Sequence, residues 1–123
     1  MFTAALQGVQ SGKCIDVPAR SHADNVGLIQ WSCHNGLNQK ITFTPVTGKI
    51  DVYTLVFQHS QKCLHVPGTN DGVDLVQKTC DSSTSQQFKL ELVGTDVYRV
   101  NAENSGKAID VENFSTVIRR RPI

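Results

Sequence analysis

Apolar and polar residues follow no helical period along this chain. No stretch keeps apolar residues at a 3.6-residue spacing over three turns, and the longest uninterrupted apolar runs are three residues, Ala4 to Leu6 and Leu55 to Phe57. Val, Ile and Thr number 14, 7 and 10, against 8 Leu. Because β-branched side chains favour strands, this pattern predicts an all-β fold. Three segments have a strand-like pattern: Thr3 to Val9, Tyr53 to Gln58 and Tyr98 to Ala102.

One short motif occurs three times. Residues 11–18 read SGKCIDVP, residues 60–67 read SQKCLHVP and residues 105–111 read SGKAIDV, and their starts are 49 and 45 residues apart. Each copy follows one of the strand-like segments, so the repeat is longer than the motif. A repeat of this period indicates a fold built from equivalent units.

The second half of the unit occurs twice. Residues 28–41 read LIQWSCHNGLNQKI, and residues 75–88 read LVQKTCDSSTSQQF. Between the two halves lie loops rich in Pro, Gly, Asn and Asp, at 18–27 and 67–72, which suit tight reversals. We therefore expect each complete unit to consist of about four short strands.

The third unit is shorter than the other two. Only 15 residues follow Ala108, whereas 27 residues separate Cys14 from Ile41 in the first unit. We expect the final strands of the third unit to be missing. The length also fits one domain, which we divide into repeats of about 1–47, 48–94 and 95–123, the last incomplete at its C-terminus.

Charge and hydropathy exclude several classes of partner. The formal charge is +1, from 12 basic and 11 acidic residues, so the chain lacks the basic excess on which nucleic-acid binding depends. Its apolar runs are far shorter than the roughly 18 residues of a transmembrane helix, and we expect no membrane insertion. Gln7, Gln10 and Lys13 interrupt the only candidate for a secretory signal.

The cysteines occupy the same two places in two successive units. Cys14 and Cys33 are 19 residues apart, and Cys63 and Cys80 are 17 apart. Four cysteines allow three pairings, and the repeat selects the pairing within each unit. Ala108 replaces the first cysteine of the third unit, so the cysteines vary as pairs, as cross-links do. Buried reduced cysteines are the alternative; zinc is disfavoured because close Cys-x2-4-Cys spacing is absent.

The repeated strand, the paired cysteines and the Asn-Gln turn together resemble the ricin B-type (R-type) lectin domain, a β-trefoil. The resemblance covers nearly the whole chain, strongly over 1–47, well over 50–93 and partly over 96–118. The family's Gln-x-Trp signature is weakened, because Ile41 and Phe88 hold the tryptophan place, a core position in the family. The resemblance implies a carbohydrate-binding protein without catalytic activity or cofactor, specific for galactose or N-acetylgalactosamine.

The resemblance also implies one shallow sugar site, in the first unit. Asp16 matches the family's sugar-binding aspartate, Trp31 its stacking ring and Asn38 its turn amide. Gln39 matches the residue that holds the aspartate in place. A carboxylate accepts hydrogen bonds from vicinal hydroxyls, an aromatic face packs on the C–H side of a pyranose, and an amide both donates and accepts. The residues expected along the rim are Gln30, His34 and Asn35.

The other two units depart from this pattern. In the second unit His65, Lys78 and Ser85 stand where the first has the aspartate, the ring and the amide, while Gln86 remains. We therefore expect a unit kept for the fold and silent in binding. The third unit has Asp110 but lacks the aromatic strand and the Asn-Gln turn, which favours a structural role for this residue.

No motif of a known catalytic class is visible in the chain, and we expect no enzyme. The alternative function is a trefoil protease inhibitor or protein-interaction module. Paired cysteines predict a secreted or extracellular protein, with glycans as partners and with either self-association through the incomplete third repeat or low stability. We expect the four histidines to be isolated surface residues: His22, His34, His59 and His65.

Overall fold

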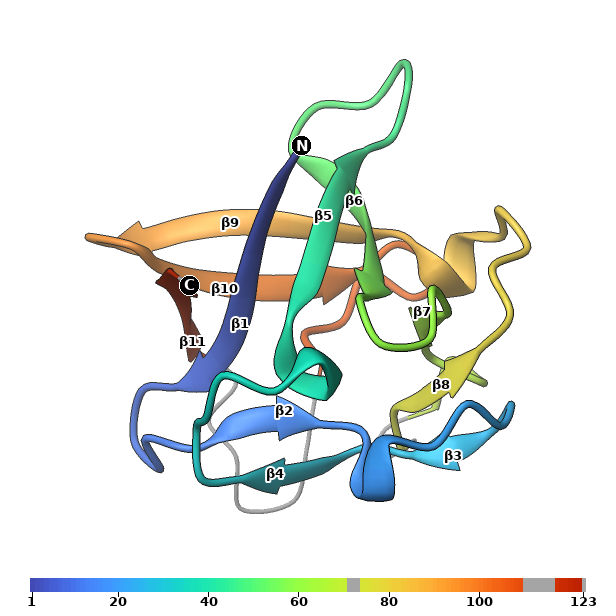
Figure 1. Ribbon diagram of the computed structural model, residues 1–123. Helices are drawn as coiled ribbons and strands as arrows, with labels where there is room; N and C mark the ends of the chain where they lie inside the picture. Colours follow the sequence, from blue (N-terminus) through green and yellow to red (C-terminus); the bar gives the residue numbers. More distant parts are fainter. Residues whose placement is uncertain (71–73, 110–116, 123) are drawn as a thin grey trace.

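The computed structural model describes residues 1–70, 74–109 and 117–122. In these ranges the chain forms strands and short 3-10 turns, without an α-helix (Figure 1). The strands are β1 (Phe2–Gly8), β2 (Cys14–Asp16), β3 (Val26–Gly27), β4 (Ile29–Trp31), β5 (Ile41–Pro45), β6 (Val52–Phe57), β7 (Cys63–His65), β8 (Val76–Lys78), β9 (Phe88–Gly94), β10 (Val97–Ala102) and β11 (Val117–Pro122). The 3-10 turns are η1 (Pro18–Arg20), η2 (Leu37–Gln39) and η3 (Thr84–Gln86). None of the described residues belongs to a helix long and apolar enough to cross a membrane.

Six of the strands form a closed antiparallel barrel. In order around the ring, β1 pairs with β5, β5 with β6, β6 with β9, β9 with β10, β10 with β11, and β11 with β1. Each unit contributes its first and last strands to this ring. Closure removes the exposed strand edges that an open sheet would have.

The inner strands of the units form a second layer beside the barrel. In the first two units they are the hairpins β2–β4 and β7–β8, and Figure 1 shows both hairpins at one end of the barrel strands. Each unit joins this layer to the barrel by one backbone pair at an equivalent position. These pairs are Gln7 with Cys14, Val56 with Cys63, and Asn101 with Ala108. This arrangement is the predicted trefoil of repeated units.

The structure corrects, for the last strand, the expectation that the final strands of the third unit are missing. Strand β11 pairs with β1 over residues 118–122 and with β10 over residues 117–119. It therefore takes the place that β5 and β9 take in the other units. The unit is shorter because β11 begins nine residues after Ala108, whereas β5 begins 27 residues after Cys14. Within 95–109 and 117–122 the third unit has no counterpart of β4 or β8.

The core fills the barrel and the space between the two layers. Its fully buried aromatic rings are Phe43, Phe57 and Phe88, and Ile41 is equally buried. The two residues that replace the family's tryptophan, Ile41 and Phe88, thus lie in the core as expected. Full burial of each such side chain contributes about 1.5–3 kcal/mol to stability. A bulky apolar side chain other than an indole can therefore fill these positions.

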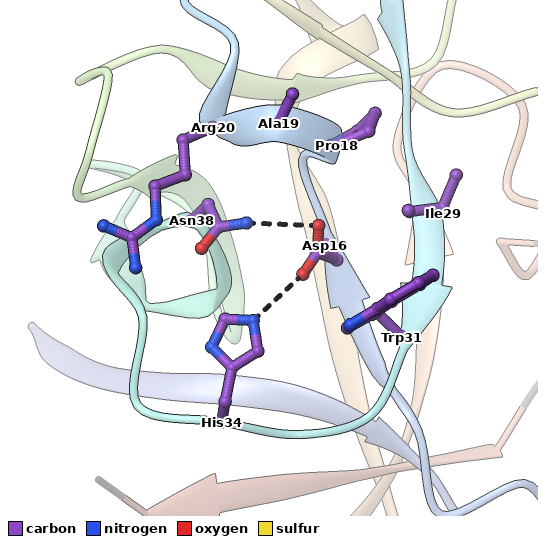
Figure 2. A pocket seen from close by; sticks show the side chains of 8 residues that line it. All are labelled: Asp16, Pro18, Ala19, Arg20, Ile29, Trp31, His34 and Asn38. Carbon is purple, nitrogen blue, oxygen red and sulfur yellow. Dashed lines mark hydrogen bonds and ion pairs between the residues drawn. The ribbon is translucent and has the colours of Figure 1, made fainter.

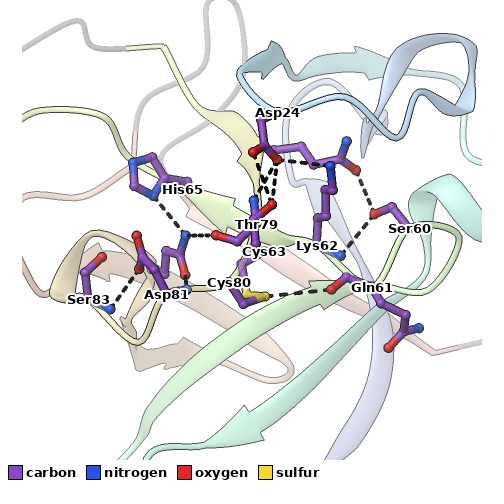
Figure 3. Close-up of a disulfide and its surroundings, with 12 residues drawn as sticks. Asp24, Ser60, Gln61, Lys62, Cys63, His65, Thr79, Cys80, Asp81 and Ser83 are labelled. Carbon is purple, nitrogen blue, oxygen red and sulfur yellow. Dashed lines mark hydrogen bonds and ion pairs between the residues drawn. A yellow bond between two sulfur atoms is a disulfide. The ribbon is translucent and has the colours of Figure 1, made fainter.

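Both cysteine pairs form disulfides within their own units. Cys14 bonds Cys33 and Cys63 bonds Cys80, each with a Cα–Cα distance of 5.1 Å. The second pair is drawn in Figure 3. The described residues include no free cysteine, so the pairing predicted from the repeat is confirmed. Loops of this length stabilise a fold by roughly 3 kcal/mol each in the chain-entropy model.

The loop after β2, predicted as a plain reversal, binds the second unit. Its short strand β3 pairs with β8. The Asp24 carboxylate accepts a hydrogen bond from the backbone N–H of Thr79 (2.8 Å) and forms an ion pair with Lys62 (3.0 Å; Figure 3). The buried Gln77 side chain donates to the carbonyl of Ser21 (3.0 Å). These contacts fix the segment that leads out of the predicted sugar site.

Candidate functional site

The carboxylate of Asp16 is the centre of the candidate site. Asp16 ends β2 and is 4% exposed. Its Oδ1 accepts a hydrogen bond from Asn38 Nδ2 (3.1 Å), and its Oδ2 accepts one from Gln39 Nε2 (2.8 Å). His34 Nε2 lies 3.4 Å from the same Oδ2 (Figure 2). A carboxylate oxygen has two lone pairs, so Oδ1 retains acceptor capacity after binding the Asn38 amide.

The turn η2 supplies the two amides that hold this carboxylate. Gln39 is fully buried; its Nε2 also donates to the carbonyl of Ser32 (3.1 Å), and its Oε1 accepts from the backbone N–H of His34 (2.9 Å). Asn38 Nδ2 also donates to the carbonyl of Val17 (3.0 Å). The buried Oδ1 of Asn38 has no hydrogen-bond partner among the described residues. An acceptor with unmet capacity therefore lies beside the carboxylate.

The orientation of the His34 ring follows from the neighbouring glycine. The backbone N–H of Gly36 donates to His34 Nδ1 (2.9 Å), so in the neutral ring the proton is on Nε2, the atom that faces Asp16. A Cβ on Gly36 would lie 2.5 Å from His34 Cε1 and 2.8 Å from Asn38 Oδ1. Only glycine leaves room for both side chains.

An exposed aromatic ring lies beside this polar cluster. Trp31 ends β4, is 58% exposed, and lines a cavity of about 420 Å³ together with Ile29. The residues that line the cavity are Asp16, Pro18, Ala19, Arg20, Ile29, Trp31, His34 and Asn38. The alternation of residues along this strand does not decide whether Trp31 faces the core or the surface. The structure places its ring in the cavity and outside the core. Figure 2 shows the ring on one side of Asp16, opposite Arg20.

The sequence did not predict the wall of the cavity that lies opposite the indole. It is the turn η1, in which Ala19 and Arg20 have φ values of 54° and 51°. This left-handed conformation costs a non-glycine residue roughly 1–2 kcal/mol. The only local sequence signal is Pro18, which fixes the start of the turn.

Two of the expected rim residues do not line the cavity. Gln30 alternates with Ile29 and Trp31 along β4 and pairs with Ile15. Asn35 is exposed but lies outside the lining set. Gln39 does not line it either, because it is buried beneath Asp16 and holds the carboxylate from below the surface. His34 is the one rim residue that the structure brings into the cavity.

The second unit repeats the supporting contacts around a different residue. Gln86 Nε2 donates to the carbonyl of Thr79 (2.9 Å), and Gln86 Oε1 accepts from the N–H of Asp81 (2.8 Å), matching the contacts of Gln39. His65 takes the place of Asp16 in this unit, and Gln86 Nε2 lies 3.2 Å from its Nδ1. Burial lowers the pKa of His65, and the charge of Lys78 adds to this effect. The second unit therefore presents a buried neutral imidazole in place of a carboxylate.

A residue of the third unit occupies the neighbourhood of the missing turn amide. Asn104 Nδ2 donates to the carbonyl of Gly68 (3.2 Å) and lies 3.5 Å from the carbonyl of Val66 and from Ser85 Oγ. In the first unit the corresponding carbonyl, Val17, is bound by Asn38. Asn104 thus binds backbone groups of the second unit beside Ser85. Asp110, the candidate of the third unit, lies outside the described residues.

The expectation of four isolated surface histidines is wrong. His65 is 7% exposed, and His34 lies in the site. The rings of His22 and His59 contact each other edge to face, with centroids 5.2 Å apart, and His59 Nε2 lies 2.8 Å from the carbonyl of Ser21. Burial lowers the pKa of His59, and the hydrogen bond to Ser21 opposes this effect. Across the described ranges, no three His, Cys, Asp or Glu side chains are grouped to hold a metal ion.

Comparison with known proteins agrees with this geometry. The family model described as the ricin-type beta-trefoil lectin domain matches residues 2–120. The chain belongs to this family. Membership supports carbohydrate binding as the general function of the domain.

Solved structures with the same fold include a designed and a natural protein of related sequence. ThreeFoil, a designed 3-fold symmetric protein, is 33% identical with a TM-score of 0.85, and the match covers 98% of this chain and 89% of that one. A region of 1,3Gal43A, an exo-beta-1,3-galactanase from Clostridium thermocellum, is 27% identical with a TM-score of 0.84. That match covers 98% of this chain and 27% of the galactanase.

A more distant neighbour shares the fold. The hemolytic lectin CEL-III has a TM-score of 0.76 and is 20% identical to this chain, which is covered in full and spans 28% of the CEL-III chain. The chain thus spans roughly a quarter of both natural proteins.

Proposed function

We propose that the cavity of the first unit binds a galactose-type sugar, galactose or N-acetylgalactosamine, without catalysing a reaction on it. The observation that carries this proposal is the pairing of a buried, oriented carboxylate with an exposed indole in one cavity. Asp16 offers charge-assisted hydrogen bonds, which are stronger than neutral ones. Trp31 offers an apolar face to the C–H side of the ring. The presence of a trefoil of related sequence within a galactanase supports a galactose-type ligand.

The contacts in the site indicate which residues bind the sugar and which hold the carboxylate in place. Hydroxyls of the sugar donate to the Asp16 carboxylate, whose Oδ1 retains acceptor capacity beside the hydrogen bond that it accepts from Asn38. Gln39 and His34 hold the carboxylate before the ligand arrives, so little ordering remains to be done on binding. An axial hydroxyl at C4 of galactose leaves the other face of the ring with contiguous C–H groups, which suits stacking on Trp31.

We propose one functional site per chain. In the second unit a neutral imidazole donates or accepts at one atom each, whereas a carboxylate accepts at both oxygens. Lys78 offers no aromatic face at the place of Trp31. A single open site binds a sugar weakly, and useful avidity then comes from multivalency.

The disulfides support a proposal about location. Disulfides persist in oxidising compartments and are rare in the cytosol, so we place this chain outside the cell. Unpaired strand edges would favour self-association, but β11 pairs with both β1 and β10. We therefore propose that a single chain folds without a partner.

Titration with monosaccharides tests the proposal directly. Trp31 is the only tryptophan of the chain, so indole fluorescence reports on the site itself. Methyl galactoside and N-acetylgalactosamine are expected to change this fluorescence saturably, and calorimetry is expected to give one site per chain. Methyl mannoside is the control sugar. If neither galactose-type sugar gives a saturable response, the proposal is refuted. A stoichiometry of two sites per chain would refute the proposal that the second unit does not bind sugar.

A further inference from the structure

The cavity contains a cation that the recognition of a neutral sugar does not use. Arg20 ends η1 and lines the cavity across from Trp31 (Figure 2). Its guanidinium forms no hydrogen bond or ion pair with the described residues. Three other basic residues form ion pairs, Lys49 with Glu103, Lys62 with Asp24 and Arg99 with Glu91, and none of these three lines the cavity. Arg20 is therefore held in the cavity with all of its donors available.

The backbone keeps this residue in place at a cost. Ala19 and Arg20 both adopt the left-handed conformation, which non-glycine residues rarely adopt. The N–H of Arg20 donates to the carbonyl of Val17 (3.2 Å). The next residue, Ser21, is bound by the second unit, since its carbonyl accepts from Gln77 Nε2 at 3.0 Å. Arg20 is thus fixed from both sides, and its placement in the cavity does not depend on a mobile loop.

We propose that Arg20 makes this site selective for galactose-type sugars that carry an oxyanion, a sulfate ester or a carboxylate. A guanidinium binds the oxygens of such a group bidentately, with charge assistance. The carboxylate of Asp16 repels an anion, so the anionic group lies at the Arg20 side and not on the hydroxyls that Asp16 binds. The inference rests on the proposed sugar site and names its ligand class more narrowly.

The position of the anionic group sharpens the expectation. A sulfate on a hydroxyl that donates to Asp16 removes a donor and adds repulsion, so that isomer is expected to bind more weakly than the neutral sugar. A sulfate directed toward Arg20 is expected to bind about 1.5- to 5-fold more tightly at low ionic strength, as for an exposed ion pair. Salt is expected to reduce this gain, because exposed charges are screened.

The test compares methyl galactoside with its 3-, 4- and 6-sulfates and with methyl galacturonoside, at 20 mM and 300 mM NaCl. Arg20→Asn is the neutral variant, because asparagine tolerates the left-handed conformation. Arg20→Lys retains the charge without the bidentate geometry. Lys89→Gln, an exposed residue of β9, makes the same change in net charge away from the cavity. Thermal melting checks that each variant is folded.

We expect at least one anionic sugar to bind more tightly than methyl galactoside to the parent protein and to Lys89→Gln. Arg20→Asn is expected to lose this preference and to keep the affinity for methyl galactoside within about twofold, and Arg20→Lys to retain part of it. Binding of the neutral sugar with no preference for any anionic one would overturn this inference alone. A preference that survives in Arg20→Asn would overturn it too. Failure of every sugar to bind would overturn the proposed function as well.

Discussion

Gly36 donates its backbone N–H to Nδ1 of His34 at a distance of 2.9 Å. This bond leaves the ring proton on Nε2, 3.4 Å from the Asp16 carboxylate. The tautomer of the histidine, and through it part of the orientation of the carboxylate, therefore depends on a residue that itself lies outside the cavity lining.

Gly36→Ala is expected to weaken sugar binding without unfolding the protein. The added Cβ would lie 2.5 Å from His34 and 2.8 Å from Asn38 Oδ1, so both side chains have to move. Loss of one or two oriented hydrogen bonds at about 1 kcal/mol each corresponds to a roughly 5- to 30-fold weaker affinity. Fluorescence titration with methyl galactoside measures the effect. Gly27→Ala is the matched control, because a Cβ there meets nothing within 4 Å; equal affinities of the two variants would contradict the role of Gly36.

Trp31→Ala and Asp16→Asn are expected to separate binding from stability. Trp31 is 58% exposed, so its truncation is expected to abolish sugar binding and to change the free energy of unfolding by less than about 0.5 kcal/mol. Asp16→Asn places an amide against the donors of Asn38 and Gln39. We expect that variant to lose binding and also about 1–3 kcal/mol of stability.

Urea unfolding and calorimetric titration of both variants check this pair of expectations. The contacts of Asp16 with Asn38 and Gln39 make this residue part of the folded framework as well as of the sugar site. Retention of sugar affinity in either variant would remove the residue from the site, and a fully stable Asp16→Asn would show that its hydrogen-bond network adds little.

The repeat in the sequence was sufficient to predict the fold because it carries the core. Ile41 and Phe88 lie at the same place in two units and are both buried completely. The paired spacing of the cysteines predicted the disulfides for the same reason, since equivalent residues occupy equivalent positions. Asp16, Trp31 and Asn38 were likewise placed together in the cavity by their position in the unit.

Features that depend on contacts between units were missed. Strand β11 belongs to the barrel because it pairs with β1 and β10, and the segment VIRRRP by itself shows no alternation that predicts this. The left-handed turn at Ala19 and Arg20 depends on contacts of the following residues with β8. The contact between His22 and His59 joins two units as well. Local patterns contain no information about such partners.

Mild acid is expected to destabilise the protein through two histidines. Burial lowers the pKa of both His59 and His65 below the ordinary 6.5, so between the two values the unfolded chain binds more protons than the folded one. The contribution of these two histidines to the free energy of unfolding is therefore fully present above pH 6.5. It decreases as the pH falls from 6.5 through the lowered pKa values. Protonation of His59 also places a charge beside His22 and Arg20.

A second decrease is expected at lower pH. Hydrogen bonds from Lys62 to Asp24 and from Ser83 to Asp81 hold the pKa of each carboxyl below 3.8. The stability that they contribute is present above 3.8 and is lost as the pH falls further. Urea midpoints measured from pH 7.5 to pH 3 test both windows. The double variant His59→Gln, His65→Gln is expected to flatten only the upper one; an unchanged midpoint of the parent between pH 7 and pH 5 would contradict the histidine assignment.

Removal of β11 is expected to convert a monomer into an associating chain. A protein ending before Val117 loses the pairs of β11 with β1 and β10, and the unpaired edges of both strands then recruit other chains. The full chain is expected to be monomeric, with a thermal midpoint independent of concentration.

Light scattering and thermal melting over a hundredfold range of concentration compare it with the truncated form and with a control that lacks only Pro122 and Ile123. A midpoint of the full chain that rises with concentration would show that β11 does not close the barrel in solution, because only association makes stability depend on concentration.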